Sequence, residues 1–170
     1  METNSIMAPA TTDQVISREA LLSHWQGHRA LTRRVIEAFP EEQFYTYSIG
    51  GMRTFSELTM EMLGIAAPGI RGIVFCDWTF SEPKLDWSTP APETKEELLK
   101  LWDLVTEYIN VLWPQIPEGR FQEVDKSFGM WEGKVYDLFL YFVDNEIHHR
   151  AQAYVYLRSL GIEPPAFWDR

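Results

Sequence analysis

Three polar side chains share one stripe of an otherwise apolar segment near the C-terminus. Helical steps of three and four residues place the following on one face: Leu138, Phe142, Asn145, His149, Gln152 and Tyr156. Burying an amide or an imidazole without a partner costs about 1–3 kcal/mol, so hydrogen bonds or a metal ion must satisfy these groups. The stripe therefore predicts a polar site inside the fold.

Metal binding is one use for such a site. Asn145 and His149 are four residues apart, one helical turn, so both can face the same ion. An amide oxygen is a weak ligand for zinc-like metals, and a carboxylate from another helix would strengthen the pair. Glu61 lies beside the buried face of an earlier segment and is the best candidate. Glu61, Asn145 and His149 would leave positions open for water or substrate.

The same side chains can also be satisfied without metal. In this alternative Glu61 and His149 form a buried ion pair, and Asn145 and Gln152 complete the hydrogen bonds. His28, on the inward stripe of the first segment, is a substitute ligand. His148 lies about 100° around the helix from His149, so it belongs at the surface or an interface.

Four amphipathic segments would position these residues. The first begins at the N-cap Ser17 and ends before Pro40, and the second begins at Thr54 with a Thr-x-x-Glu capping box. A second capping box begins the third segment at Thr94, and the fourth covers about 134–160. Four such segments in one domain predict an all-α four-helix bundle.

The segments between these helices give further expectations. The second helix should bury Phe55, Leu58, Met62 and Ile65, and its glycines and Pro68 predict a bend before the apolar run 73–76. Cys76, within that run, is expected to be a small buried side chain. Residues 43–53 predict a loop, 81–93 a long surface linker, and 121–135 a small β-hairpin.

Length and composition limit the kind of protein that this chain can be. A chain of 170 residues is enough for one domain, here 16–170, after a flexible tail over 1–15. Since 45% of the residues are hydrophobic, the chain should fold compactly, and its net charge of −10 argues against nucleic-acid binding. A single cysteine excludes an internal disulfide. Without a secretory pattern or 18 uninterrupted apolar residues, we expect a cytoplasmic protein with no membrane contact.

Two stretches resemble the DinB/YfiT-like superfamily of bacterial four-helix-bundle proteins. They are 52–64, from Met-Arg-Thr-Phe-Ser-Glu-Leu to Glu-Met-Leu-Gly, and 144–152, Asp-Asn-Glu-Ile-His-His-Arg-Ala-Gln, which continues to Gly161. Similarity to this superfamily implies three inward ligand positions for zinc, nickel or a similar divalent ion. In this chain they fall on Glu61, Asn145 and His149, so two of the usual three histidines are replaced.

The resemblance also implies a function. Members include metal-dependent transferases and isomerases that use low-molecular-weight thiols. We therefore expect a divalent-metal pocket between the second and fourth helices, in which a thiol-dependent transferase or a hydrolase would act on a small molecule. The alternative is a non-catalytic bundle with a degenerate metal site that binds a small molecule or a partner. A homodimer is expected from the resemblance and from the aromatic content.

Overall fold

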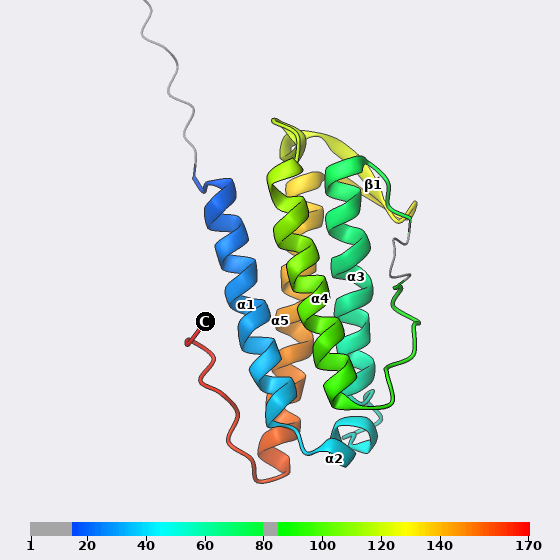
Figure 1. Ribbon diagram of the computed structural model, residues 1–170, viewed down its shortest axis with the longest axis vertical. Coiled ribbons are helices and arrows are strands. Elements are labelled where there is room, and N and C mark those ends of the chain that lie inside the picture. The colour runs from blue at the N-terminus through cyan, green and yellow to red at the C-terminus, as the bar shows by residue number, and fades with distance from the viewer. Residues whose placement is uncertain (1–14, 80–84) are drawn as a thin grey trace, which may run out of the picture.

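Five α-helices and one β-hairpin make up the computed structural model, which describes residues 15–79 and 85–170 (Figure 1). The helices are α1 (Arg18–Ala38), α2 (Glu41–Thr46), α3 (Phe55–Phe75), α4 (Lys95–Leu112) and α5 (Val135–Ser159). Two short 3₁₀ turns, Trp113–Gln115 and Arg120–Gln122, lead to the antiparallel strands β1 (Val124–Ser127) and β2 (Trp131–Lys134). The predicted hairpin before the last helix is confirmed.

The four long helices form the predicted four-helix bundle. α1 and α5 run in one direction, whereas α3 and α4 both run in the other, because the chain returns along the bundle between them (Figure 1). The short α2 closes one end and the hairpin lies at the other. This topology places α3 directly against α5, which is the packing that a site shared by the two helices requires.

Side chains fix the helix ends much as the sequence predicts. Ser17 caps α1 by accepting a hydrogen bond from the amide of Ala20 at 3.1 Å. Thr54 and Thr94 form complete capping boxes at the starts of α3 and α4. Gly161, with φ 76°, ends α5 in the left-handed region, and the amide of the next residue bonds back to the last helical turn.

Three sequence predictions about the connections and helix bounds are wrong. The predicted loop 43–53 begins inside α2, which forms because Phe44 is buried against Phe39 and Phe55. α3 continues as one helix through Pro68 to Phe75 instead of breaking at its glycines. Cys76 is exposed, since it is the residue after α3 and takes a left-handed conformation with φ 55°. The predicted tail 1–15 lies outside the described residues except for its last residue, Val15. Of the predicted linker 81–93, residues 85–93 are described and contain neither helix nor strand, whereas 81–84 lie outside the described residues.

Glycines on α3 allow neighbouring segments to pack closely. A Cβ on Gly69 would lie 2.6 Å from the Phe142 ring of α5, and one on Gly72 would lie 2.1 Å from the Trp78 ring. At Gly64 the obstacle is backbone, because a Cβ would lie 2.3 Å from the carbonyl carbon of Asp86. The small residues that suggested a bend therefore serve packing instead.

The composition of α3 follows from its central place. Within the described residues it is the one helix long and apolar enough to cross a membrane by length and composition, with a mean hydropathy of 1.3 over its most apolar window. Yet 83% of that window is buried inside the bundle. Packing against the other helices accounts for its apolar side chains, including the predicted Phe55, Leu58, Met62 and Ile65.

Candidate functional site

The carboxylate of Glu61 is the centre of a polar cluster between α3 and α5. Its Oε1 atom lies 2.8 Å from Nε2 of His149 and accepts a hydrogen bond from Nδ2 of Asn145 at 3.1 Å. Its Oε2 atom pairs with the guanidinium of Arg53. The three residues singled out in the sequence therefore meet at one point, with Arg53 as a fourth member.

Both helices and the preceding loop hold this arrangement. Asn145 and His149 are buried one turn apart on α5, as the spacing predicts. Glu61 lies two turns into α3, and Arg53 immediately precedes the N-cap Thr54. Tyr156, one of the most buried side chains of α5, donates a hydrogen bond from its hydroxyl to the carbonyl of Arg53 at 2.8 Å. This bond fixes the backbone of Arg53 to α5, the helix that also carries Asn145 and His149, the other two partners of Glu61.

The cluster keeps Glu61 ionised. Burial raises the pKa of its carboxyl, but hydrogen bonds from His149, Arg53 and Asn145 outweigh burial and leave the pKa below its ordinary value. Since the Glu61 side chain is 18% exposed, a negative charge is presented at the edge of the bundle interior.

Two buried polar atoms of the cluster have no hydrogen-bond partner: Oδ1 of Asn145 and Nδ1 of His149. Within the described residues no three His, Cys, Asp or Glu side chains gather to hold a metal, so an ion here would depend on Asn145. A metal-bound imidazole normally donates its other N–H to an acceptor, which Nδ1 of His149 lacks. The Arg53 guanidinium also occupies Oε2 of Glu61. In this arrangement the three side chains do not fit a divalent ion.

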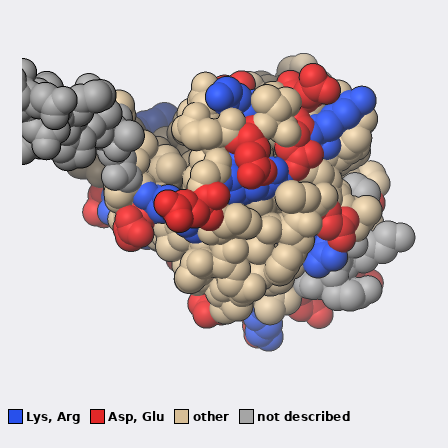
Figure 2. Space-filling view, turned by 90° about the horizontal axis from the view of Figure 1, so that it is seen from above, with Lys and Arg blue, Asp and Glu red and all other residues tan. Residues whose placement is uncertain are grey.

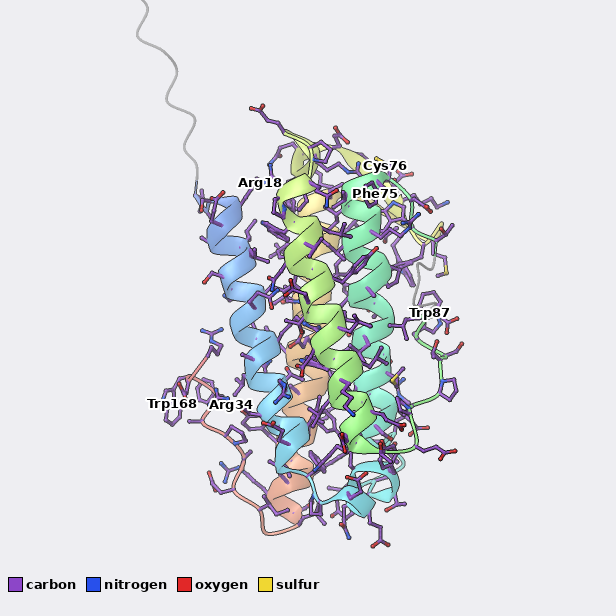
Figure 3. The ribbon with its side chains drawn as sticks, viewed as in Figure 1. Arg18, Arg34, Phe75, Cys76, Trp87 and Trp168 are labelled. Carbon is purple, nitrogen blue, oxygen red and sulfur yellow. The ribbon has the colours of Figure 1, made fainter. Side chains whose placement is uncertain are left out.

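A small aromatic pocket of about 190 Å³ opens beside Glu61. Its other lining residues are Ile65 on α3, Trp87 on the connection to α4, Phe128 and Trp131 on the hairpin, and Tyr141 on α5. Trp87 lies on the outer side of α3, away from α1 (Figure 3). Glu61 is the one charged residue among those that line the pocket.

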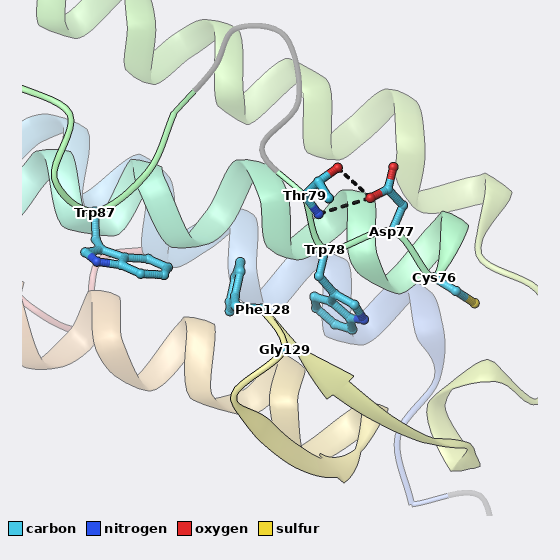
Figure 4. A pocket seen from close by; sticks show the side chains of 7 residues that line it. All are labelled: Cys76, Asp77, Trp78, Thr79, Trp87, Phe128 and Gly129. Carbon is cyan, nitrogen blue, oxygen red and sulfur yellow. Dashed lines mark hydrogen bonds between the residues drawn. The ribbon is translucent and has the colours of Figure 1, made fainter.

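A larger and more open hollow of about 640 Å³ shares Trp87 and Phe128 with this pocket. Figure 4 shows its lining residues between α3 and the hairpin, among them the rings of Trp87, Phe128 and Trp78. The thiol of Cys76 points away from the three rings, and the Asp77 carboxylate is engaged by Thr79. The hollow therefore offers apolar surface beside the aromatic pocket.

Other sequence candidates lie elsewhere. Gln152 is half-buried and contacts Nε2 of the exposed His148 at 2.9 Å, so it does not join Glu61. His28 is buried as predicted, but its ring contacts guanidinium groups of Arg150 at 2.8 Å and Arg170 at 2.9 Å. His28 is therefore part of a different cluster from the three predicted ligands.

That second cluster joins α1, α4 and α5. Glu146 accepts a hydrogen bond from Thr32 at 2.6 Å and faces Arg29 at 3.7 Å and Arg150 at 3.8 Å. Arg29 in turn stacks on the ring of Trp102. All of these side chains are buried, and they make most of their contacts with one another. We assign this cluster to the packing of the bundle.

Sequence reasoning missed Arg53 and the aromatic walls. Arg53 directly precedes the predicted N-cap Thr54, so its long side chain can reach the first two turns of α3, which include Glu61. No local signal brings Trp87, Trp131 and Tyr141 together, because they come from three different elements.

The chain is similar to known proteins over nearly its whole length. A family model described as the DinB family matches residues 7–169. The fold resembles a solved DinB-like protein from Bacillus subtilis, YjoA, with a TM-score of 0.70 and 18% identity over 88% of this chain and 98% of that one. A DinB-like protein from Bacillus cereus ATCC 10987 has a TM-score of 0.70 and 15% identity over 87% and 95%.

A more distant structural neighbour is a mycothiol-dependent maleylpyruvate isomerase. Its TM-score is 0.56 at 13% identity, and the match covers 80% of this chain but 60% of the isomerase. No curated protein matches the chain in sequence. At these identities the solved structures support the bundle fold alone.

Proposed function

The chain belongs to the DinB family, and we propose that it binds a compact small molecule in the pocket between α3 and α5, with the Glu61 carboxylate as the recognition group. The main observation in support of this proposal is that Glu61, Asn145 and His149 meet at one point beside the 190 Å³ pocket. In this proposal Asn145 and His149 orient the carboxylate, which needs no resident metal.

A metal-loaded, thiol-using enzyme is the second candidate. The unpartnered Oδ1 of Asn145 favours it, because rotation of the amide would turn that oxygen toward Glu61 and His149. The mycothiol dependence of the distant neighbour supports a thiol as co-substrate. Zinc or nickel would then require Arg53 to leave Glu61. The cytoplasmic location and the homodimer also stay predictions.

Metal analysis separates the two candidates. Protein purified without a metal-affinity column should contain far less than one equivalent of zinc or nickel, and added zinc should leave the melting temperature unchanged. One tightly held equivalent, lost in His149→Ala, would instead establish the second candidate.

Ligand binding is tested by thermal shift with probes of three charge classes: choline, reduced glutathione and acetate. A probe at ten times its dissociation constant stabilises the native state by about 1.4 kcal/mol, which raises the melting temperature by roughly 3–6 °C for a chain of this size. We expect a shift with at least one class, abolished in Glu61→Gln. If no probe shifts the wild-type protein, the proposed function fails.

A further inference from the structure

Three aromatic rings at the pocket stand nearly perpendicular to one another. The planes of Trp87 and Phe128 meet at 87°, those of Phe128 and Trp131 at 83°, and those of Trp87 and Trp131 at 73°. Their centroids are 5.7–6.4 Å apart, and Tyr141 contributes another wall. Rings in three perpendicular planes form the corner of a box, the arrangement that surrounds a cation with aromatic faces.

Three of the four aromatic walls are exposed at the surface, whereas Phe128 is half-buried and packs against Trp78 and Phe142 of the core. Trp87 is 39% exposed, Trp131 is 53% exposed and Tyr141 is 55% exposed. Phe128 has φ 53°, a left-handed conformation that is strained for a bulky side chain. Such strain persists where the surroundings enforce it, often at ligand sites. The hairpin turn thus holds the Phe128 ring in the pocket at a conformational cost.

The charge in this box is negative. Glu61 supplies a carboxylate held ionised by its neighbours, and the other lining residues are uncharged. The electron-rich faces of Trp, Tyr and Phe attract cations in the same way. A carboxylate and several aromatic faces around one small space select a cation over an anion or a neutral molecule.

Arg53 already shows that the carboxylate accepts a guanidinium. Its side chain is 48% exposed and that of Glu61 is 18% exposed, so the guanidinium covers the carboxylate from the solvent side. A methylated ammonium needs no coordination position on the carboxylate, so it can lie near Glu61 while Arg53 stays paired with Oε2. The pocket is smaller than the roughly 300–1,000 Å³ that drug-sized ligands occupy, so the cation must be compact. The hollow beyond Phe128 leaves room for one substituent.

We propose that the ligand is a compact organic cation, an alkylated or methylated ammonium, held between Trp87, Phe128, Trp131 and Tyr141 with the Glu61 carboxylate as counter-ion. The proposal rests on the proposed function, because it names the ligand class of the same pocket. It gives the exposed tryptophans a role that neither core packing nor a metal site provides.

Choline and its uncharged carbon isostere 3,3-dimethyl-1-butanol test the charge requirement. Titration followed by tryptophan fluorescence and calorimetry should show choline binding about tenfold or more tighter than the alcohol, since cation–π and carboxylate contacts together are worth roughly one to two kcal/mol. Equal affinities, or no choline binding at 50 mM, would overturn the proposal.

Variants test the residues. Glu61→Gln and Trp131→Leu should each weaken choline binding about tenfold, whereas Arg53→Met should strengthen it because the positive charge of the guanidinium is gone. Trp168→Leu is the matched control, since this 73% exposed tryptophan lies on the opposite side of the bundle (Figure 3). Circular dichroism and melting temperature establish that each variant folds. Choline binding that is unchanged in folded Glu61→Gln and Trp131→Leu contradicts the assignment.

The thermal-shift data with the three probes show whether the cation inference fails alone or together with the proposed function. If glutathione or acetate raises the melting temperature of the wild-type protein, but not of Glu61→Gln, while choline does nothing, the pocket binds a ligand and the cation inference is wrong. If all three fail, both proposals fall.

Discussion

His28 illustrates how one buried residue couples protonation to stability. Burial, Arg150, His24 and Arg170 together lower the pKa of its imidazole from 6.5 to about 3. Glu146, which faces Arg150, is the nearby acid of the same cluster. Below pH 6.5 the unfolded chain therefore binds a proton that the folded chain does not, and the stabilisation from neutral His28 is lost as the pH falls toward 3.

We therefore predict that His28→Asn removes part of the acid sensitivity. The asparagine oxygen can still accept a hydrogen bond from Arg150 but takes up no proton. Between pH 6.5 and 3 the wild-type stability should fall more steeply than that of the variant, by up to about 1.4 kcal/mol per pH unit. Urea unfolding at intervals of half a pH unit measures both slopes. Parallel slopes for the two proteins would refute the prediction.

At the same scale the sequence predicted the contacts of the site better than its surroundings. Asn145 and His149 face α3 because their spacing matches one helical turn, and Glu61 meets them because α3 packs on α5. The same periodicity fails for Gln152, which turns to His148 near the surface. Periodicity gives direction around a helix, but it does not say which neighbour a long side chain will choose.

Gly64 links α3 to the wall of the pocket. Its Cα faces the backbone of Asp86 and Trp87, where an added Cβ would lie 2.3 Å and 2.6 Å from main-chain atoms. In a helix, alanine normally stabilises by about 0.5–1 kcal/mol relative to glycine. Here the clash with rigid backbone should outweigh that gain and push Trp87 away from Phe128 and Glu61.

Gly64→Ala should therefore lower the free energy of unfolding by about 1–3 kcal/mol and also weaken choline binding. Urea unfolding and fluorescence titration measure the two effects. Gly133→Ala is the control, since a Cβ there would meet Leu138 at an ordinary 3.7 Å. A Gly64→Ala protein as stable as the wild type would show that the connection moves aside without cost.

Local sequence signals predict the helix ends well, but they predict the connections between helices poorly. Thr54, Thr94 and Gly161 act within one turn of the chain, so their roles could be predicted. α2 exists because Phe44 reaches Phe39 and Phe55, a tertiary contact that residues 43–53 do not reveal by themselves. Pro68 stays inside α3 for the same reason, because surrounding helices bury that turn on every side.

The outer surface of the whole molecule bears on the predicted homodimer. Lys and Arg are interspersed with Asp and Glu on the end of the bundle shown in Figure 2. On α4, Leu104 and Val111 are 53% and 55% exposed and lie seven residues apart. Two partly buried residues continue the same stripe: Leu101, one turn before Leu104, and Tyr108, between Leu104 and Val111. Heptad spacing of this kind is typical of a seam between two helices.

We predict that two copies associate through this stripe of α4. Sedimentation equilibrium should give twice the monomer mass of 19.9 kDa for the wild type and the monomer mass for Leu104→Lys. Val155→Lys, on an equally exposed position of α5, should leave the dimer intact. Because each copy carries a charge of −10, added salt should tighten the dimer by screening the repulsion between copies. A wild-type monomer at all salt concentrations, or a dimer dissociated by Val155→Lys instead, would exclude the α4 seam.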